Sequence, residues 1–273
     1  MDTSTWMERD LLVDGKLMHY MRTGNGEKPP LVLAHGFSDD GACWTPTARD
    51  LEAQYDVVMP DARGHGRSDR VQPGEVVDQT GDLAALMVAL GLEPAIVAGH
   101  SMGAWMASEL AARFPALVRA VILEDAPWRP SSEGDVSKAL LNRESTLATW
   151  VRGMEGMTVD EIVARERSEH PTWSDEALYL WCAAKTRLDL NFLEIAGMGR
   201  MDWQEVARAI ACPTLLITAD PAQGGIVTPE VADMAQALNP RIEVVNIPGV
   251  GHHVRFEAHD AYMEAVRGFL GRV

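Results

Sequence analysis

The chain has 273 residues, of which 47% are hydrophobic and 23% are charged, and its formal net charge is -16. A chain of this length and composition can bury a sizeable core, either as one large α/β domain with an insertion or as two domains. The acidic balance argues against binding to nucleic acid or to an anionic membrane, because both require clustered Lys and Arg.

Short apolar runs alternate with helical patterns along most of the chain. Four runs predict buried parallel strands, each followed by a loop and a helix, at residues 31–34, 57–59, 96–98 and 121–123. The pattern stops after Pro127 and resumes with a strand at 213–218, a helix at about 229–238, a strand at 242–247 and a helix at about 258–270. This order predicts a mostly parallel, doubly wound α/β sheet.

The interruption between these two parts, residues 128–202, has helical periodicity without a convincing strand. We therefore predict a helical cap there, inserted into a core domain made of residues 1–127 and 203–273. Any one tryptophan packs in a core more often than it binds a ligand. As a group, however, the tryptophans of this stretch favour an apolar substrate cavity, with Trp128 and Trp181 as candidate substrate-binding residues. Five of the eight tryptophans lie in this stretch or at its end: Trp128, Trp150, Trp173, Trp181 and Trp203.

Residues 99–103 read Gly-His-Ser-Met-Gly, between a predicted strand and a helical pattern. A serine with a glycine two residues away on each side fits a sharp strand-to-helix turn, because glycine has no Cβ atom to clash there. The same letters also occur by chance as a simple turn, but their context predicts that Ser101 is a nucleophile. The backbone N–H groups of Phe37, which follows the strand at 31–34, and of Met102 are candidates for an oxyanion hole.

A serine nucleophile needs a base to remove its proton. The run Pro248-Gly249-Val250-Gly251-His252-His253 follows the last predicted strand and precedes the last predicted helix. It therefore forms a loop on the edge of the sheet that also carries Ser101. We predict that His252 is the base and that His253 is a surface or packing histidine.

Four motifs follow one another along the chain: His35-Gly36-Phe37, the run at 61–68, the run at 99–103 and the run at 251–253. By the order and approximate spacing of these motifs, the chain resembles the α/β-hydrolase superfamily over nearly its whole length. The resemblance implies an α/β-hydrolase fold with a helical cap inserted after strand six. Capped members that resemble epoxide hydrolases and haloalkane dehalogenases use Asp as the nucleophile, so Ser101 argues against those two activities.

The resemblance also implies two positions for the triad acid. Most members place it in a Gly-x-x-Asp loop, where this chain has Ala219-Asp220-Pro221, so Asp220 could serve only in a remodelled loop. A second arrangement, similar to haloalkane dehalogenases and some small esterases and lactonases, places it 24 residues beyond the nucleophile, at Asp125. Asp125 is our preferred acid and Asp220 the alternative. Asp220 otherwise starts a turn, and Asp125 otherwise supports the cap entrance by hydrogen bonding.

Together these features predict a serine hydrolase, a carboxylesterase or lactonase without a cofactor, that cleaves an ester or lactone of a fairly apolar small molecule through an acyl-enzyme intermediate. Two alternatives stay open. One is a carbon–carbon bond hydrolase, whose carboxylate-bearing substrate would need basic residues such as Arg187, Arg200 and Arg255, although such arginines are more often solvated. The other is a ligand receptor of this fold with little turnover.

The remaining expectations concern setting and partners. No metal site is expected, because the eight histidines form no metal-ligand motif. Three widely spaced cysteines favour a reducing, cytoplasmic setting, and no apolar run approaches the roughly 18 residues of a membrane span. We expect a soluble monomer or homodimer whose partner is a small-molecule ester or lactone.

Overall fold

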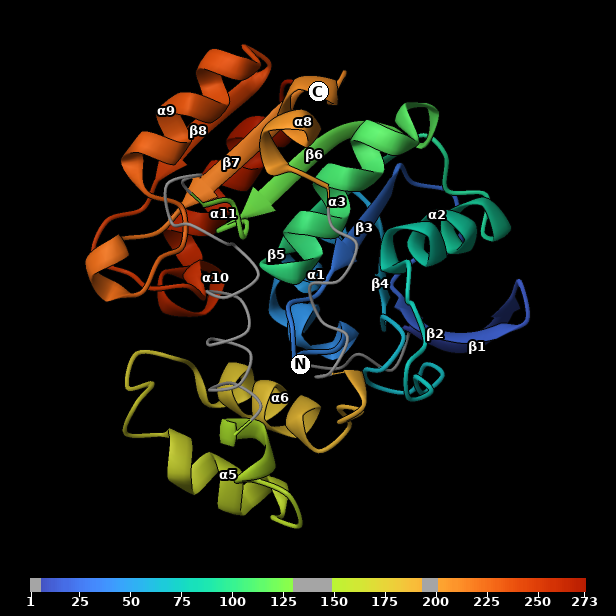
Figure 1. Cartoon of the computed structure of the whole chain (residues 1–273), viewed down its shortest axis with the longest axis vertical. Coiled ribbons are helices and arrows are strands. Elements are labelled where there is room, and N and C mark those ends of the chain that lie inside the picture. The colour runs from blue at the N-terminus through green and yellow to red at the C-terminus, as the bar shows by residue number, and fades with distance from the viewer. Residues whose placement is uncertain (1–5, 130–148, 193–200) are drawn as a thin grey trace.

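The computed structural model describes residues 6–129, 149–192 and 201–273 (Figure 1). Its strands form one sheet in the order β1-β2-β4-β3-β5-β6-β7-β8. The β1–β2 and β2–β4 pairs are antiparallel, and every pair from β4–β3 to β7–β8 is parallel. The predicted mostly parallel, doubly wound sheet is therefore confirmed. The strands are β1 (Met7–Val13), β2 (Lys16–Arg22), β3 (Pro30–Ala34), β4 (Asp56–Pro60), β5 (Ala95–His100), β6 (Val118–Glu124), β7 (Thr214–Thr218) and β8 (Ile242–Asn246).

The hairpin β1–β2 is an addition to the strands that the sequence predicts. β1 lies at the edge of the sheet, and its first half carries the polar residues Glu8, Arg9 and Asp10, which are exposed. Asp14 and Gly15 join the two strands with φ values of 51° and 79°. A two-residue turn with both φ values positive is the common connection of a β-hairpin, so the Asp-Gly pair was the available signal.

Both faces of the sheet are covered by helices. Successive residues of a strand point to opposite sides, and the buried strands carry apolar residues on both sides, so each face needs a cover. Val32 packs on the face covered by α2, α3, α8 and α9, whereas Leu31 and Leu33 pack on the face covered by α1, α10 and α11. The covering helices are α1 (Thr45–Leu51), α2 (Gln79–Ala89), α3 (Met102–Arg113), α8 (Trp203–Ala209), α9 (Pro229–Leu238), α10 (Val254–Glu257) and α11 (His259–Leu270), with short 3₁₀ turns η1 (Gly41–Trp44), η2 (Pro115–Leu117) and η3 (Pro221–Gln223).

Residues 149–192, called here the helical segment, lie at one end of the molecule (Figure 1), where Glu176 pairs with Arg49 of α1 and Trp173 packs on Phe256 of α10. They contain α5 (Val159–Glu166) and α6 (Asp175–Lys185). α5 starts with a capping box between Thr158 and Glu161, and the Ser174 hydroxyl caps α6 by accepting from the Ala177 N–H at 3.1 Å. The domain boundaries stay a prediction, since residues 130–148 and 193–200 lie outside the described ranges.

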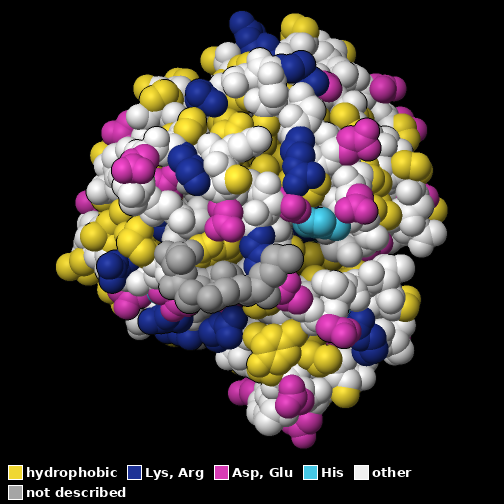
Figure 2. All heavy atoms as spheres, turned by 180° about the vertical axis from the view of Figure 1, so that it is seen from behind, with side chains coloured by type: hydrophobic (Ala, Val, Ile, Leu, Met, Phe, Trp, Pro, Cys, Tyr) yellow, Lys and Arg dark blue, Asp and Glu magenta, His cyan; other side chains and the backbone are white. Residues whose placement is uncertain are grey.

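The surface carries charges of both signs. Figure 2 shows acidic and basic side chains interspersed on the face opposite to that of Figure 1. Within the described ranges, every helix is too short or too polar to cross a membrane.

Candidate active site

Ser101 occupies the turn between β5 and α3, with φ 51° and ψ -114°. Such a left-handed φ is unfavourable for a residue with a side chain. The two flanking glycines permit the turn. A Cβ on Gly99 would lie 2.1 Å from the Gly103 carbonyl oxygen, and a Cβ on Gly103 would lie 2.0 Å from that of Ala34. The spacing of the motif thus lets α3 start against its own strand and against β3.

Ser101 is held at this turn by its main chain. Its N–H donates to the Glu124 carbonyl of β6 at 3.0 Å, and its carbonyl accepts from the Trp105 N–H at 2.9 Å. The side chain makes no capping hydrogen bond to α3. The residue is partly exposed, in a strand end that is otherwise buried. The hydroxyl is therefore presented by a fixed backbone.

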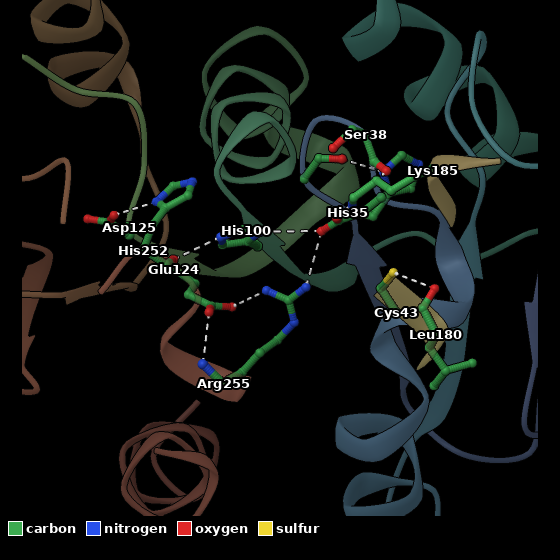
Figure 3. A network of polar contacts seen from close by, with 12 residues as sticks. His35, Ser38, Cys43, His100, Glu124, Asp125, Leu180, Lys185, His252 and Arg255 are labelled. Atoms are coloured by element: carbon green, nitrogen blue, oxygen red, sulfur yellow. Dashed lines mark hydrogen bonds and ion pairs between the residues drawn. The ribbon is translucent and has the colours of Figure 1, made fainter. Parts of the chain in front are cut away.

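Asp125 and His252 are brought together from positions 127 residues apart in the chain (Figure 3). The His252 Nδ1 donates to the Asp125 carboxylate at 2.6 Å, which leaves Nε2 as the basic nitrogen of a neutral ring. Asp125 is fully buried, with φ 41°, directly after β6. Its carboxylate also accepts from the N–H groups of Ile226 at 2.9 Å and Val227 at 3.1 Å. These bonds fix the carboxylate and, through it, the imidazole.

Asp220 has a different task. Its side chain caps the η3 turn by accepting from the Ala222 N–H at 2.9 Å, directly before Pro221. Of the two aspartates that the sequence proposes as the acid, the structure thus joins Asp125 to His252 and places the carboxylate of Asp220 on its own turn.

The oxyanion-hole candidates lie beyond the ends of two neighbouring strands. β3 and β5 pair in register up to Ala34 and Gly99, so the residues after each strand emerge side by side. Met102 is the first residue of α3, where the N–H groups have no partner within the helix. The Phe37 ring packs against Phe192 with centroids 5.7 Å apart. The role of these two N–H groups stays a prediction.

The two tryptophans proposed to bind substrate lie in different surroundings. Trp128 is fully buried in the core of the sheet and stacks on Trp203, with centroids 5.4 Å apart. Trp181 lies on α6 in an aromatic group with Trp150, Trp173 and His253. His253, the neighbour of the proposed base, packs among these rings, and burial lowers its pKa well below 6.5. Substrate binding by either tryptophan stays a prediction.

Two arginines proposed as carboxylate binders are ion-paired; the expectation of a solvated surface arginine was wrong for Arg255, whereas Arg187 keeps 35% of its side chain exposed. Arg255 is 1% exposed and pairs with Glu124 at 3.1 Å and with Asp39 at 3.3 Å. The Nε atom of Arg187 donates to the Asp40 carboxylate at 2.8 Å. Arg200 lies outside the described residues. The ion pairs of Arg187 and Arg255 could not be predicted from local sequence, because the acidic partners lie far away in the chain.

One cluster in the described part of the chain has a spacing that a metal ion could use. Ligand atoms of Asp39, His100 and His253 lie within 4.8 Å of one another. However, the Asp39 carboxylate already pairs with Lys185 and Arg255. Their two positive charges disfavour a cation at the same carboxylate.

Comparisons with known proteins find similar proteins over nearly the whole chain. The model of the alpha/beta hydrolase family matches residues 31–265. The chain is 30% identical to N-formylmaleamate deformylase of Pseudomonas putida over 272 residues, which cover 94% of each protein. It is 26% identical to 2-(acetamidomethylene)succinate hydrolase of Mesorhizobium japonicum, over 90% of this chain and 89% of the relative. The crystal structure of an enol-lactonase from Burkholderia xenovorans superposes with a TM-score of 0.74 at 25% identity and covers 97% of this chain and 100% of that one.

Proposed function

The chain belongs to the alpha/beta hydrolase family, and on this premise we propose that it is a serine hydrolase that cleaves a carboxylic ester or lactone of a fairly apolar small molecule. The observation that carries the proposal is the 2.6 Å hydrogen bond between His252 and the buried Asp125, on the edge of the sheet where Ser101 occupies a strained turn. A base held in this way and a serine on such a turn are the parts that acyl transfer needs.

In the proposed mechanism, the Ser101 Oγ attacks the carbonyl carbon while the His252 Nε2 takes the hydroxyl proton. Asp125 orients the ring and stabilises the imidazolium. The N–H groups of Phe37 and Met102 stabilise the oxyanion of the tetrahedral intermediate. The intermediate collapses, and His252 returns the proton to the leaving alcohol. Water then attacks the acyl-enzyme by the same route, which releases the acid and restores Ser101. No cofactor takes part.

The apolar character of the proposed substrate is supported by the side chains near the base. The helical segment contributes Trp150, Trp173 and Trp181, and His253 packs against the last two with ring centroids 5.0 and 5.8 Å away. Arg187 and Arg255, the described arginines proposed for a carboxylate, are both paired with acidic side chains. This pairing favours an ester or lactone over a carbon–carbon bond hydrolase that recognises its substrate through those arginines.

A second candidate is hydrolysis of an N-formyl or N-acyl group. It is favoured by the likeness to N-formylmaleamate deformylase, which extends over 94% of both chains. The same nucleophile, base and acid would serve, with a nitrogen leaving group in place of the alcohol. The cytoplasmic location and the monomeric or dimeric state stay predictions from the sequence.

The test compares the wild type with Ser101→Ala on short p-nitrophenyl esters, lactones of graded size and an N-formyl amide that bears a carboxylate. Loss of the nucleophile should lower kcat by about 10⁵- to 10⁶-fold. Ser108→Ala is the matched control, because Ser108 lies on the same helix and its hydroxyl only bonds the Trp105 carbonyl. Full activity of Ser101→Ala would refute the mechanism. A wild type as inert as Ser101→Ala, with a ligand that still raises the Tm, would identify a receptor.

A further inference from the structure

Five buried polar residues form a network next to the candidate triad (Figure 3). We call it the Asp39 network, and each member is at most 5% exposed. Two carboxylates alternate in it with two cations. Its members are Asp39, His100, Glu124, Lys185 and Arg255.

Asp39 is the junction of this network. Its Oδ1 lies 3.0 Å from the Lys185 Nζ, and its Oδ2 lies 3.3 Å from a terminal nitrogen of Arg255. Arg255 also donates to the Glu124 carboxylate, from its guanidinium at 3.1 Å and from its main-chain N–H at 3.0 Å. Burial would raise the pKa of Asp39, but the charge of Lys185, the nearby His100 ring and the charge of Arg255 hold it well below 3.8. The carboxylate is thus ionised and its charge compensated inside the protein.

The network touches the base directly through His100. The His100 Nε2 donates to the main-chain carbonyl of His252 at 2.9 Å, and its Nδ1 faces the Asp39 Oδ2 at 3.7 Å. The loop that carries the proposed base is therefore bonded to the last residue of β5. Four of the five members also lie within three residues of a proposed catalytic residue in the chain. His100 precedes Ser101, Glu124 precedes Asp125, Arg255 follows His252, and Asp39 follows Phe37.

Lys185 brings the helical segment into this arrangement. It is the last residue of α6, and its side chain is fully buried. Its Nζ also donates to the Ser38 carbonyl at 2.9 Å and lies 4.0 Å from the centre of the Trp181 ring. Because a buried carboxylate needs its cations, the position of α6 and the position of Asp39 depend on each other.

We propose that Asp39 and His100 are positioning residues, which set the place of His252 relative to Ser101 and couple that place to the seating of α6 on the core. This proposal rests on the proposed serine-hydrolase function. It gives the helical segment a part in catalysis besides contact with substrate. Its physical basis is that a displacement of about 1 Å in a catalytic group can cost on the order of 100-fold in rate.

The first test varies the donor to His252. His100→Leu removes the hydrogen bond to the His252 carbonyl, and we expect kcat for p-nitrophenyl butyrate to fall at least about tenfold with KM within about twofold. His100→Gln places an amide N–H near the position of Nε2, so it should recover most of the loss. A purely structural role would lower the Tm of both variants and leave the kcat of folded protein unchanged.

The second test removes the cation of the helical segment. Lys185→Met should lower kcat about tenfold, and Lys185→Met combined with Asp39→Asn should lose less than the product of the single losses, because the double change leaves no unpaired carboxylate. Arg187→Met is the matched control. It breaks the neighbouring ion pair between the same two parts of the chain, where the Asp40 carboxylate accepts from Arg187 and from the Ala42 N–H of its own turn. It should lower the Tm and leave kcat unchanged.

The outcomes separate this proposal from the proposed function. Labelling of Ser101 by a fluorophosphonate reports nucleophile reactivity without knowledge of the substrate, and it should slow in His100→Leu and Lys185→Met. An active wild type with unchanged kcat and labelling in both folded variants would overturn the positioning role alone. A wild type that is neither labelled nor active would overturn the serine-hydrolase function. If Lys185→Met does not fold, the His100 pair decides.

Discussion

The turn that carries Ser101 and the helical segment differ in what holds them in place. At the turn, the backbones of β3, β5 and α3 approach so closely that added Cβ atoms on Gly99 or Gly103 would overlap main-chain atoms. The helical segment is tied to the core by the ion pairs of Lys185 with Asp39 and of Arg187 with Asp40, beside a main-chain hydrogen bond from the Asp189 N–H to the Gly64 carbonyl at 2.8 Å. Close backbone contacts thus fix the nucleophile, whereas contacts made by side chains do much of the work of holding the helical segment.

This contrast suggests where the chemistry and the specificity of the protein are determined. A turn built on glycines at fixed spacing tolerates few sequences, so the place of the nucleophile depends on Gly99 and Gly103. A segment attached by individual side chains can change its lining while the attachment persists. The substrate class is therefore expected to depend on the helical segment and the reaction type on the edge of the sheet.

The largest expected effect tests the edge of the sheet through its acid. Asp125→Asn should lower kcat by about 10⁴-fold, because the amide cannot hold the Nδ1–H tautomer of His252 or stabilise the imidazolium. Asp220→Asn is the control, since that side chain caps a surface turn and Asn also caps. Its kcat should stay within about threefold of wild type. A 10⁴-fold loss confined to Asp220→Asn would make Asp220 the acid.

The second prediction tests how tightly the backbone of α3 packs against β3 at the Ser101 turn. Gly103→Ala should destabilise the fold by about 3 kcal/mol or more, because its Cβ would lie 2.0 Å from the Ala34 carbonyl oxygen. In α11, the nearest atom to a Cβ on Gly268 is the flexible Arg272 Nη1 at 3.9 Å. Gly268→Ala should therefore be neutral or stabilise by up to about 1 kcal/mol. Urea unfolding measures both, and equal stabilities would show that the turn relaxes easily.

The same contrast explains what the sequence could predict. The parallel strands and the Ser101 turn follow from local patterns: apolar runs, glycine spacing and the order of strand and helix. The pairing of His252 with Asp125 needed the resemblance as well, because 127 residues separate the partners. The Asp39 network left no local signal, since Lys185 and Asp39 are 146 residues apart and look like ordinary surface charges in the sequence. Arg255 was misjudged for the same reason.

The smallest expected effect compares a histidine from each region as pH falls. His65 is fully buried in the core, where its Nδ1 donates to the Arg63 carbonyl at 3.1 Å, and burial lowers its pKa well below 6.5. Burial also lowers the pKa of His170 in the helical segment, but that residue is partly exposed. In both cases the unfolded chain binds the proton more readily, so stability is greatest above about pH 6.5 and declines below it.

For a histidine that stays neutral in the folded protein, this decline amounts to about 1.4 kcal/mol at pH 5.5. His65→Asn keeps a donor for the Arg63 carbonyl but cannot titrate. Between pH 7.5 and 5.5 its unfolding free energy should therefore fall by about 1.4 kcal/mol less than that of the wild type. His170→Asn should show a smaller change of the same sign, because water reaches part of its ring. Chemical unfolding at both pH values measures the difference. A larger change for His170→Asn would mean that the helical segment, and not the core, excludes water more completely.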